Sequence, residues 1–99
     1  MNNQPENQNQ LKIQVRPEIA EGRYSNIAMI GHTPSDFLID FIFAAPGPQQ
    51  AQVVSRVIMN PENAKKLLLA LGDNVKKYET QFGEIKLNNQ NFGGPIGNN

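Results

Sequence analysis

The sequence contains no cysteine and only one histidine, His32. Without cysteine no disulfide can stabilise the fold, and no Cys/His cluster indicates a structural metal. The net charge is zero, with nine basic and nine acidic residues intermixed, so no long-range field attracts nucleic acid or an anionic membrane. No apolar run approaches the roughly 18 residues of a membrane span, and the polar start is unlike a signal peptide. We therefore expect a cytoplasmic protein with no cofactor, metal or membrane anchor.

Apolar residues are scarce at both ends of the chain. Residues 1–10 include seven Asn or Gln, and residues 88–99 are Asn, Gln, Gly and Pro with only Phe92 and Ile96 apolar. Neither segment buries enough surface to offset the entropy of ordering, so we predict two disordered tails around a single domain at 11–87. A domain this small buries only about 60% of its unfolded surface and is marginal alone. We expect self-association to supply the missing stability.

Four segments have the apolar patterns of strands. Leu11, Ile13 and Val15 alternate with polar residues before Pro17, which predicts a strand at 11–16. Three further strands are predicted at 24–32, 37–43 and 52–59. Two turn signals separate them, Thr33-Pro34-Ser35-Asp36 and Pro46-Gly47-Pro48.

A long helix is predicted after the last strand. Asn60 is a good N-cap, and Pro61 is favoured at the first helical position. Apolar residues then recur with a 4-3-4-3-4 spacing along about six turns before Gly83: Ala64, Leu68, Leu71, Val75, Tyr78 and Phe82. The predicted fold class is α+β, a four-stranded antiparallel meander followed by one long C-terminal helix packed on one sheet face.

The last two predicted strands pair consistently as a hairpin about Pro48. One face then carries three apolar pairs, which would lie under the helix: Phe37–Met59, Ile39–Val57 and Phe43–Val53. The other face carries Asp40 opposite Arg56, a pair of opposite charges that cross-strand geometry favours. Apolar pairs flank it: Leu38–Ile58 and Ile42–Val54.

This second face is unusually aliphatic, although the one predicted helix covers only the first face of the sheet. Along a strand with one solvated face, the residues that point to water are normally polar. We therefore expect a second copy or a partner protein to cover it, with the helix as the alternative surface for assembly. The predicted interface consists of Ile27, Met29, Leu38, Asp40, Ile42, Val54, Arg56 and Ile58.

Several short motifs together resemble a known family: Tyr24-Ser25-Asn26; His32 to Phe37 with Asp40-Phe41; Ser55-Arg56-Val57 with Met59, Pro61, Ala64-Lys65 and Leu67; and Tyr78-Glu79 with Phe82-Gly83. Over roughly residues 23–85 the chain is similar to a domain-of-unknown-function family of small proteins seen in Bacteroidetes and other bacteria. The resemblance implies a bacterial cytoplasmic protein and brings no catalytic or binding residue with it.

The candidates for catalysis all have structural interpretations that we favour. His32 lies beside a turn, without a second ligand or a nucleophile at motif spacing, which favours a turn-capping role. Asp36 and Asp40 would be about 13 Å apart on a strand, beyond the roughly 5–9.5 Å of two-carboxylate hydrolysis. We therefore predict no catalytic residue and no enzyme.

Four lysines, Lys65, Lys66, Lys76 and Lys77, share the polar face of the predicted helix. Glu62 and Asp73 precede two of them by four residues, which is typical of a solvated face with ion pairs rather than of a nucleic-acid site.

The leading functional hypothesis is a non-enzymatic homo-oligomeric interaction module whose partner the sequence does not identify. The alternative is a single-stranded nucleic-acid-binding protein, because Whirly and PUR repeats also place four strands before a helix. Against the alternative, Tyr24 is the only obvious stacking platform and the neutral charge gives little attraction for phosphate.

Overall fold

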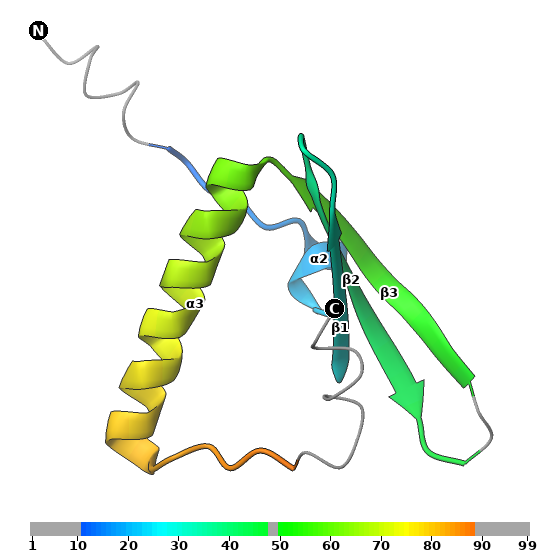
Figure 1. Ribbon diagram of the computed structural model, residues 1–99. Helices are drawn as coiled ribbons and strands as arrows, with labels where there is room; N and C mark the ends of the chain where they lie inside the picture. Colours follow the sequence, from blue (N-terminus) through cyan, green and yellow to red (C-terminus); the bar gives the residue numbers. More distant parts are fainter. Residues whose placement is uncertain (1–10, 48–49, 89–99) are drawn as a thin grey trace, which may run out of the picture.

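The computed structural model describes residues 11–47 and 50–88. A short helix, α2 (Pro17–Ala20), precedes three strands, and a long helix, α3 (Pro61–Phe82), follows them. The strands are β1 (Ile27–His32), β2 (Phe37–Ala45) and β3 (Gln50–Met59). They form one antiparallel sheet in the order β1-β2-β3 (Figure 1). The predicted α+β class and the C-terminal helix are confirmed, while the tail at 1–10 and nearly all of the tail at 88–99 lie outside the described residues.

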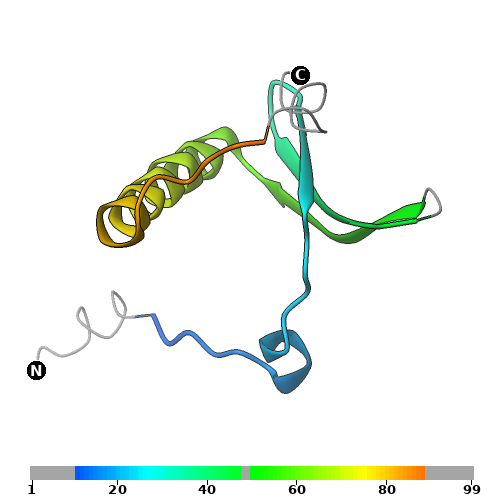
Figure 2. The ribbon, with the colours of Figure 1, turned by 90° about the horizontal axis from the view of Figure 1, so that it is seen from below.

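The predicted first strand, at 11–16, is not formed. In the described part of the chain the sheet has three strands instead of four. Figure 2 shows the segment before α2 lying apart from both the sheet and α3. Leu11, Ile13 and Val15 are 80, 84 and 61% exposed. An alternating apolar pattern forms a strand only where it meets a sheet edge. Here α2 and the residues after it direct residues 11–16 away from β1.

The turn between β1 and β2 forms as its sequence predicts. Thr33 Oγ1 accepts hydrogen bonds from the N–H groups of Ser35 and Asp36, both at 3.1 Å. The Thr33 N–H donates to the Asp36 carbonyl at 2.9 Å. Short polar side chains that bond to nearby backbone groups favour turns in this way.

The predicted register of β2 and β3 is correct over the half nearest α3. Phe37 pairs with Met59, Asp40 pairs with Arg56, and the pairing remains regular to Phe41 and Ser55. A β-bulge then shifts the register, so that Ile42 pairs with Val53 rather than with the predicted Val54. Phe43 likewise faces Gln52 rather than Val53. Val54 is the additional residue of the bulge, and it interrupts the strict alternation on which the prediction relied.

Helix α3 begins and ends at the predicted residues. The Asn60 side chain accepts a hydrogen bond from the Asn63 N–H at 2.8 Å, and Pro61 opens the first turn. At the other end Gly83 has a φ of 102° and donates its N–H to the Glu79 carbonyl at 2.9 Å. Glycine reaches that positive φ without strain, which explains why the helix ends there.

The helix does not pack closely on the sheet, contrary to the prediction. Figures 1 and 2 show α3 leaving the end of β3 and diverging from the strands. No residue of α3 is buried, and the five large side chains of its apolar stripe are between 37 and 66% exposed. We define the apolar stripe as Ala64, Leu68, Leu71, Val75, Tyr78 and Phe82. The stripe indicated which side of the helix needs cover, but not which surface provides it.

The buried core of the described chain is very small. Only Ile39 and Ile42, both on the central strand β2, are buried, at 6 and 8% exposed. They point to opposite faces of the sheet because side chains alternate along a strand. Neither face therefore has a developed core beneath it, although long apolar side chains line both.

Candidate interaction surfaces

The predicted interface residues lie mostly on one face of the sheet, which we call the far face. Three cross-strand rows form it: Ile27–Ile42–Val53, Met29–Asp40–Arg56 and Gly31–Leu38–Ile58. The opposite face, which we call the helix-side face, carries Ile30, Phe37 and Ile39, and these side chains share a groove with α3. The sequence therefore assigned the two faces correctly up to the bulge, after which Val53 lies on the far face and not on the predicted helix-side face.

Val54 is the exception among the predicted interface residues. Because of the bulge, Val53 takes its place beside Ile42. Val54 instead lines a cavity together with Phe41 and Ser55, which pair across the helix-side face. The signal that could have revealed this is the Val53-Val54 dipeptide, in which two adjacent β-branched residues break the alternation.

An ion pair occupies the centre of the far face. Arg56 donates from Nε to Asp40 Oδ1 at 2.6 Å and from Nη2 to Oδ2 at 2.9 Å. These hydrogen bonds lower the pKa of Asp40 below its ordinary value of 3.8, while desolvation opposes the shift and the charge of Arg56 adds to it. The same hydrogen bonds raise the pKa of Arg56. The pair is thus fully ionised at neutral pH.

A second apolar surface lies between α3 and the sheet, where the sequence predicted that the helix stripe and the sheet face would pack together. We call it the α3 groove; its volume is about 530 Å³ and its lining is almost wholly apolar. The helix contributes Pro61, Ala64, Lys65, Leu67, Leu68 and Leu71, and the sheet contributes Ile30, Phe37 and Ile39. The groove exists because the helix begins beside the sheet and then diverges from it (Figure 1).

The α3 surface is the more exposed of the two. On the far face the central residues are protected, because Ile42 is buried and Asp40 is partly buried against Arg56. On α3 no side chain is buried. At its C-terminal end the rings of Tyr78 and Phe82 lie against each other, with centroids 5.0 Å apart, and both are exposed.

The residues before β1 fasten that strand to the end of β2. The Asn26 side chain accepts from the Ala44 N–H at 2.9 Å and donates to the Ala44 carbonyl at 3.0 Å, as a paired backbone group would. Ser25 Oγ donates to the Ile42 carbonyl at 3.0 Å. The Tyr24 ring meets Phe43 edge-on, with centroids 5.9 Å apart. The motif Tyr24-Ser25-Asn26 therefore has a structural role.

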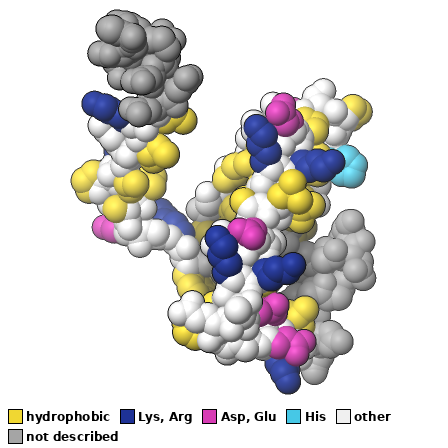
Figure 3. Space-filling view, turned by 90° about the vertical axis from the view of Figure 1, so that its left-hand side faces the viewer, with side chains coloured by type: hydrophobic (Ala, Val, Ile, Leu, Met, Phe, Trp, Pro, Cys, Tyr) yellow, Lys and Arg dark blue, Asp and Glu magenta, His cyan; other side chains and the backbone are white. Residues whose placement is uncertain are grey.

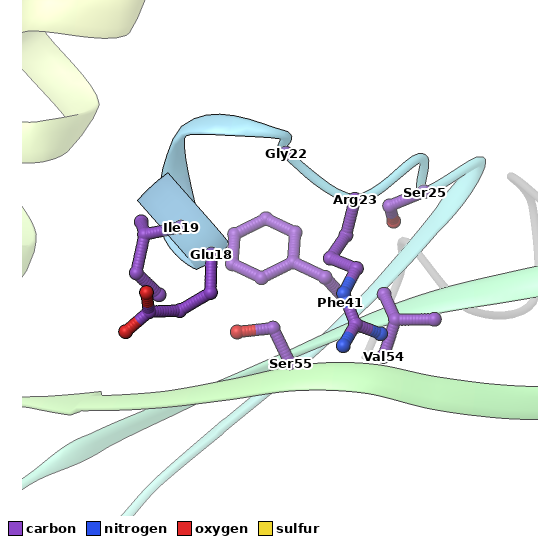
Figure 4. Close-up of a pocket in the computed structure, with 8 residues that line it drawn as sticks. All are labelled: Glu18, Ile19, Gly22, Arg23, Ser25, Phe41, Val54 and Ser55. Carbon is purple, nitrogen blue, oxygen red and sulfur yellow. The ribbon is translucent and has the colours of Figure 1, made fainter. Parts of the chain in front are cut away.

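A cavity of about 540 Å³ lies between α2 and the strands. Figure 4 shows the Phe41 ring pointing from the sheet toward α2, between Glu18 and Ile19 on one side and Arg23 on the other. Ser25 and Ser55 also line the cavity, and neither has a histidine or cysteine beside it among the lining residues. Among the described lining residues, Ser25 donates to backbone carbonyls and the Glu18 carboxylate pairs with Arg16, so these two groups are bonded elsewhere and not to each other.

His32 lies at the end of β1 and stacks on Phe37, with ring centroids 5.4 Å apart. Thr33, not His32, accepts the N–H groups of the turn. Among the described residues no three His, Cys, Asp or Glu side chains gather as metal ligands would.

The polar side of α3 carries interspersed charges of both signs (Figure 3). Lys66 pairs with Glu62 at 3.4 Å and Lys77 pairs with Asp73 at 3.3 Å, so both predicted ion pairs are confirmed. Within the described ranges, no helix combines the length and apolar character needed to cross a membrane.

These features define a small α+β protein with a three-stranded antiparallel sheet and one long C-terminal helix. The chain belongs to the family described as Protein of unknown function (DUF3467), whose model matches residues 1–87. The match confirms the resemblance in the sequence and extends it toward the N-terminus. No curated protein and no solved structure matches the chain.

Proposed function

We propose that this protein is a non-enzymatic interaction module that works as a homo-oligomer in the bacterial cytoplasm. The observation that carries the proposal is the size of the core: of the described residues, only Ile39 and Ile42 are buried hydrophobics. A domain this small buries only about 60% of its unfolded surface and is marginally stable alone, and a two-residue core leaves it less stable still. The exposed side chains of α3 and of the sheet provide the surface that association would bury.

The predicted four-stranded sheet belongs to this assembled state. We infer that residues 11–16 pair with a sheet edge when copies associate, which would complete the fourth strand, and that α3 is then covered on its apolar side. Leu11, Ile13 and Val15 are exposed and alternate as strand residues do. The outer sides of β1 and β3 have no neighbouring strand in the described sheet, and such edges accept an added strand.

Light scattering coupled to size-exclusion chromatography tests the proposal. At low-micromolar concentration we expect a mass of at least twice the 11.0 kDa of one chain. Thermal unfolding should shift to higher temperature as the protein concentration rises, because association stabilises the folded state by mass action. A folded monomer at every concentration would contradict the proposal.

A further inference from the structure

We propose that two copies of this chain pair through antiparallel α3 helices, with the C-terminal half of each helix lying in the α3 groove of the other copy. The proposal rests on the proposed self-association and adds to it the surface, the orientation and the register. It follows from the spacing of the apolar stripe, the sizes of its residues, the lining of the groove and the positions of the charges.

The spacing of the apolar stripe is self-complementary. The 4-3-4-3-4 intervals from Ala64 to Phe82 are the same when read in either direction. Two such helices related by a two-fold axis therefore match their stripes along the full length when they run antiparallel. The matched register sets three pairs, each made twice: Ala64 with Phe82, Leu68 with Tyr78, and Leu71 with Val75.

The sizes of the residues fit this register. Ala64 is the smallest residue of the stripe and lies within the α3 groove. Phe82, at the opposite end, is among the largest, and its ring is exposed. The antiparallel register places the large side chain of one copy beside the small side chain of the other, which is how well-packed helices interdigitate. A parallel pair would instead place two alanines together and two phenylalanines together.

The α3 groove has the chemistry that the C-terminal half of α3 requires. Among the described residues that line the groove, Lys65 is the only charged one. The incoming residues would be Val75, Tyr78 and Phe82, which are all apolar or aromatic and exposed in the single chain. Helix α3 is about 33 Å long, so the groove and the aromatic pair lie at opposite ends of one continuous surface.

The two ion pairs of α3 are compatible with this arrangement. Lys66 and Lys77 bind Glu62 and Asp73 on the polar side of the helix. Helical spacing puts both ion pairs on the side away from the apolar stripe, so they would remain in water when the stripes meet. Pairing would therefore bury apolar surface without removing these charges from solvent.

Cysteine cross-linking of the full chain tests orientation and register, since the native chain has no cysteine to interfere. We would co-express Leu68→Cys and Tyr78→Cys chains with tags of different mass and oxidise the purified mixture. A disulfide between the two variants is expected to predominate, because positions 68 and 78 of different copies face each other. Identical positions would be about 15 Å apart along the helix, too far for a disulfide.

Lys66→Cys mixed with Lys77→Cys is the matched control, since both positions lie on the polar side and should not cross-link. Predominant links between identical positions would indicate a parallel pair and overturn the inference. A dimer by light scattering without any helix cross-link would also overturn it, and would leave the proposed function intact. A monomer in light scattering would contradict both.

A size exchange provides a second test that does not depend on oxidation. Ala64→Phe and Phe82→Ala are each expected to weaken the dimer by about tenfold, through crowding and through a cavity respectively. The double variant restores one large and one small residue at each contact and should recover most of the affinity. Additive losses in the double variant would overturn the proposed register.

Discussion

Arg56 and Asp40 face each other across β3 and β2, and the guanidinium donates one hydrogen bond to each carboxylate oxygen, at 2.6 and 2.9 Å. The Asp40 side chain is 14% exposed and the Arg56 side chain is 57% exposed. This geometry is specific to one register. If one strand shifted by one residue relative to the other, the Asp40 and Arg56 side chains would lie on opposite faces of the sheet and could not pair. The pair therefore fixes the alignment of β2 and β3 before the bulge.

Acid should weaken the Asp40–Arg56 pair in a defined pH range. The pKa of Asp40 is lowered from 3.8 by the hydrogen bonds of Arg56. A carboxylate with a lowered folded-state pKa adds stability above its unfolded pKa and loses it as the pH falls through the folded value. The difference in melting temperature between the native protein and Asp40→Asn should be constant above about pH 5 and shrink below about pH 3.8. Asp73→Asn, which removes an exposed ion pair on α3, is the control and should show little difference.

The far face should be dispensable for self-association if the copies meet through α3. Asp40→Ala, Arg56→Ala and the double variant are expected to lower the denaturation midpoint while leaving the mass from light scattering unchanged. Leu68→Asp, which puts a charge into the apolar stripe, should instead lower the mass toward that of one chain. Dissociation caused by Asp40→Ala would assign the assembly to the far face and not to the helix.

The N-cap of α3 should make a measurable contribution to stability. Asn60→Ala removes the acceptor for the Asn63 N–H and is expected to lower the free energy of unfolding by about 1 kcal/mol. Chemical denaturation at fixed protein concentration measures the change. Asn63→Ala keeps the N–H in place and should be neutral or slightly stabilising, because alanine has the higher helix propensity. Equal losses in both variants would contradict the assigned role of the cap.

Residues 11–16 should become protected from hydrogen exchange only in the assembled state. Pairing with a sheet edge would protect alternate amides of the segment, whereas an unpaired segment exchanges freely. We expect protection at micromolar concentration in the native protein and its loss in Leu68→Asp, which should not assemble. Free exchange in a sample shown to be oligomeric would mean that this segment forms no fourth strand.

Nucleic-acid binding distinguishes the interaction module from the alternative hypothesis. We expect no mobility shift of mixed-sequence single-stranded DNA at moderate salt, because the chain has no net charge to attract phosphate. Tyr24 is 74% exposed, more than any other Tyr or Phe side chain among the described residues, and is therefore available for stacking on a base. Micromolar binding that falls steeply with salt and is weakened by Tyr24→Ala would favour the single-stranded nucleic-acid-binding protein.

Much of the local structure was predictable because its causes lie within a few residues of each other. Asn60-Pro61 and Gly83 determine where α3 begins and ends through one side-chain cap and one positive φ. Thr33 and Asp36 determine the turn between β1 and β2 through short-range hydrogen bonds. The pairing of Asp40 with Arg56 was predictable because alternation and opposite charge indicate the same register.

The sequence by itself determined the three strands of the sheet, their faces up to the bulge, and the long helix with its polar and apolar sides, because each depends on spacing along the chain. It did not indicate α2, and it predicted a strand at 11–16 that is not formed. Only the tertiary structure decided that Val54 bulges, that α3 diverges from the sheet and that residues 11–16 lie apart from the sheet. Those outcomes depend on which surfaces meet in space. An apolar pattern shows that a surface needs cover, but any apolar surface of the right shape can supply it, because the hydrophobic effect is not directional.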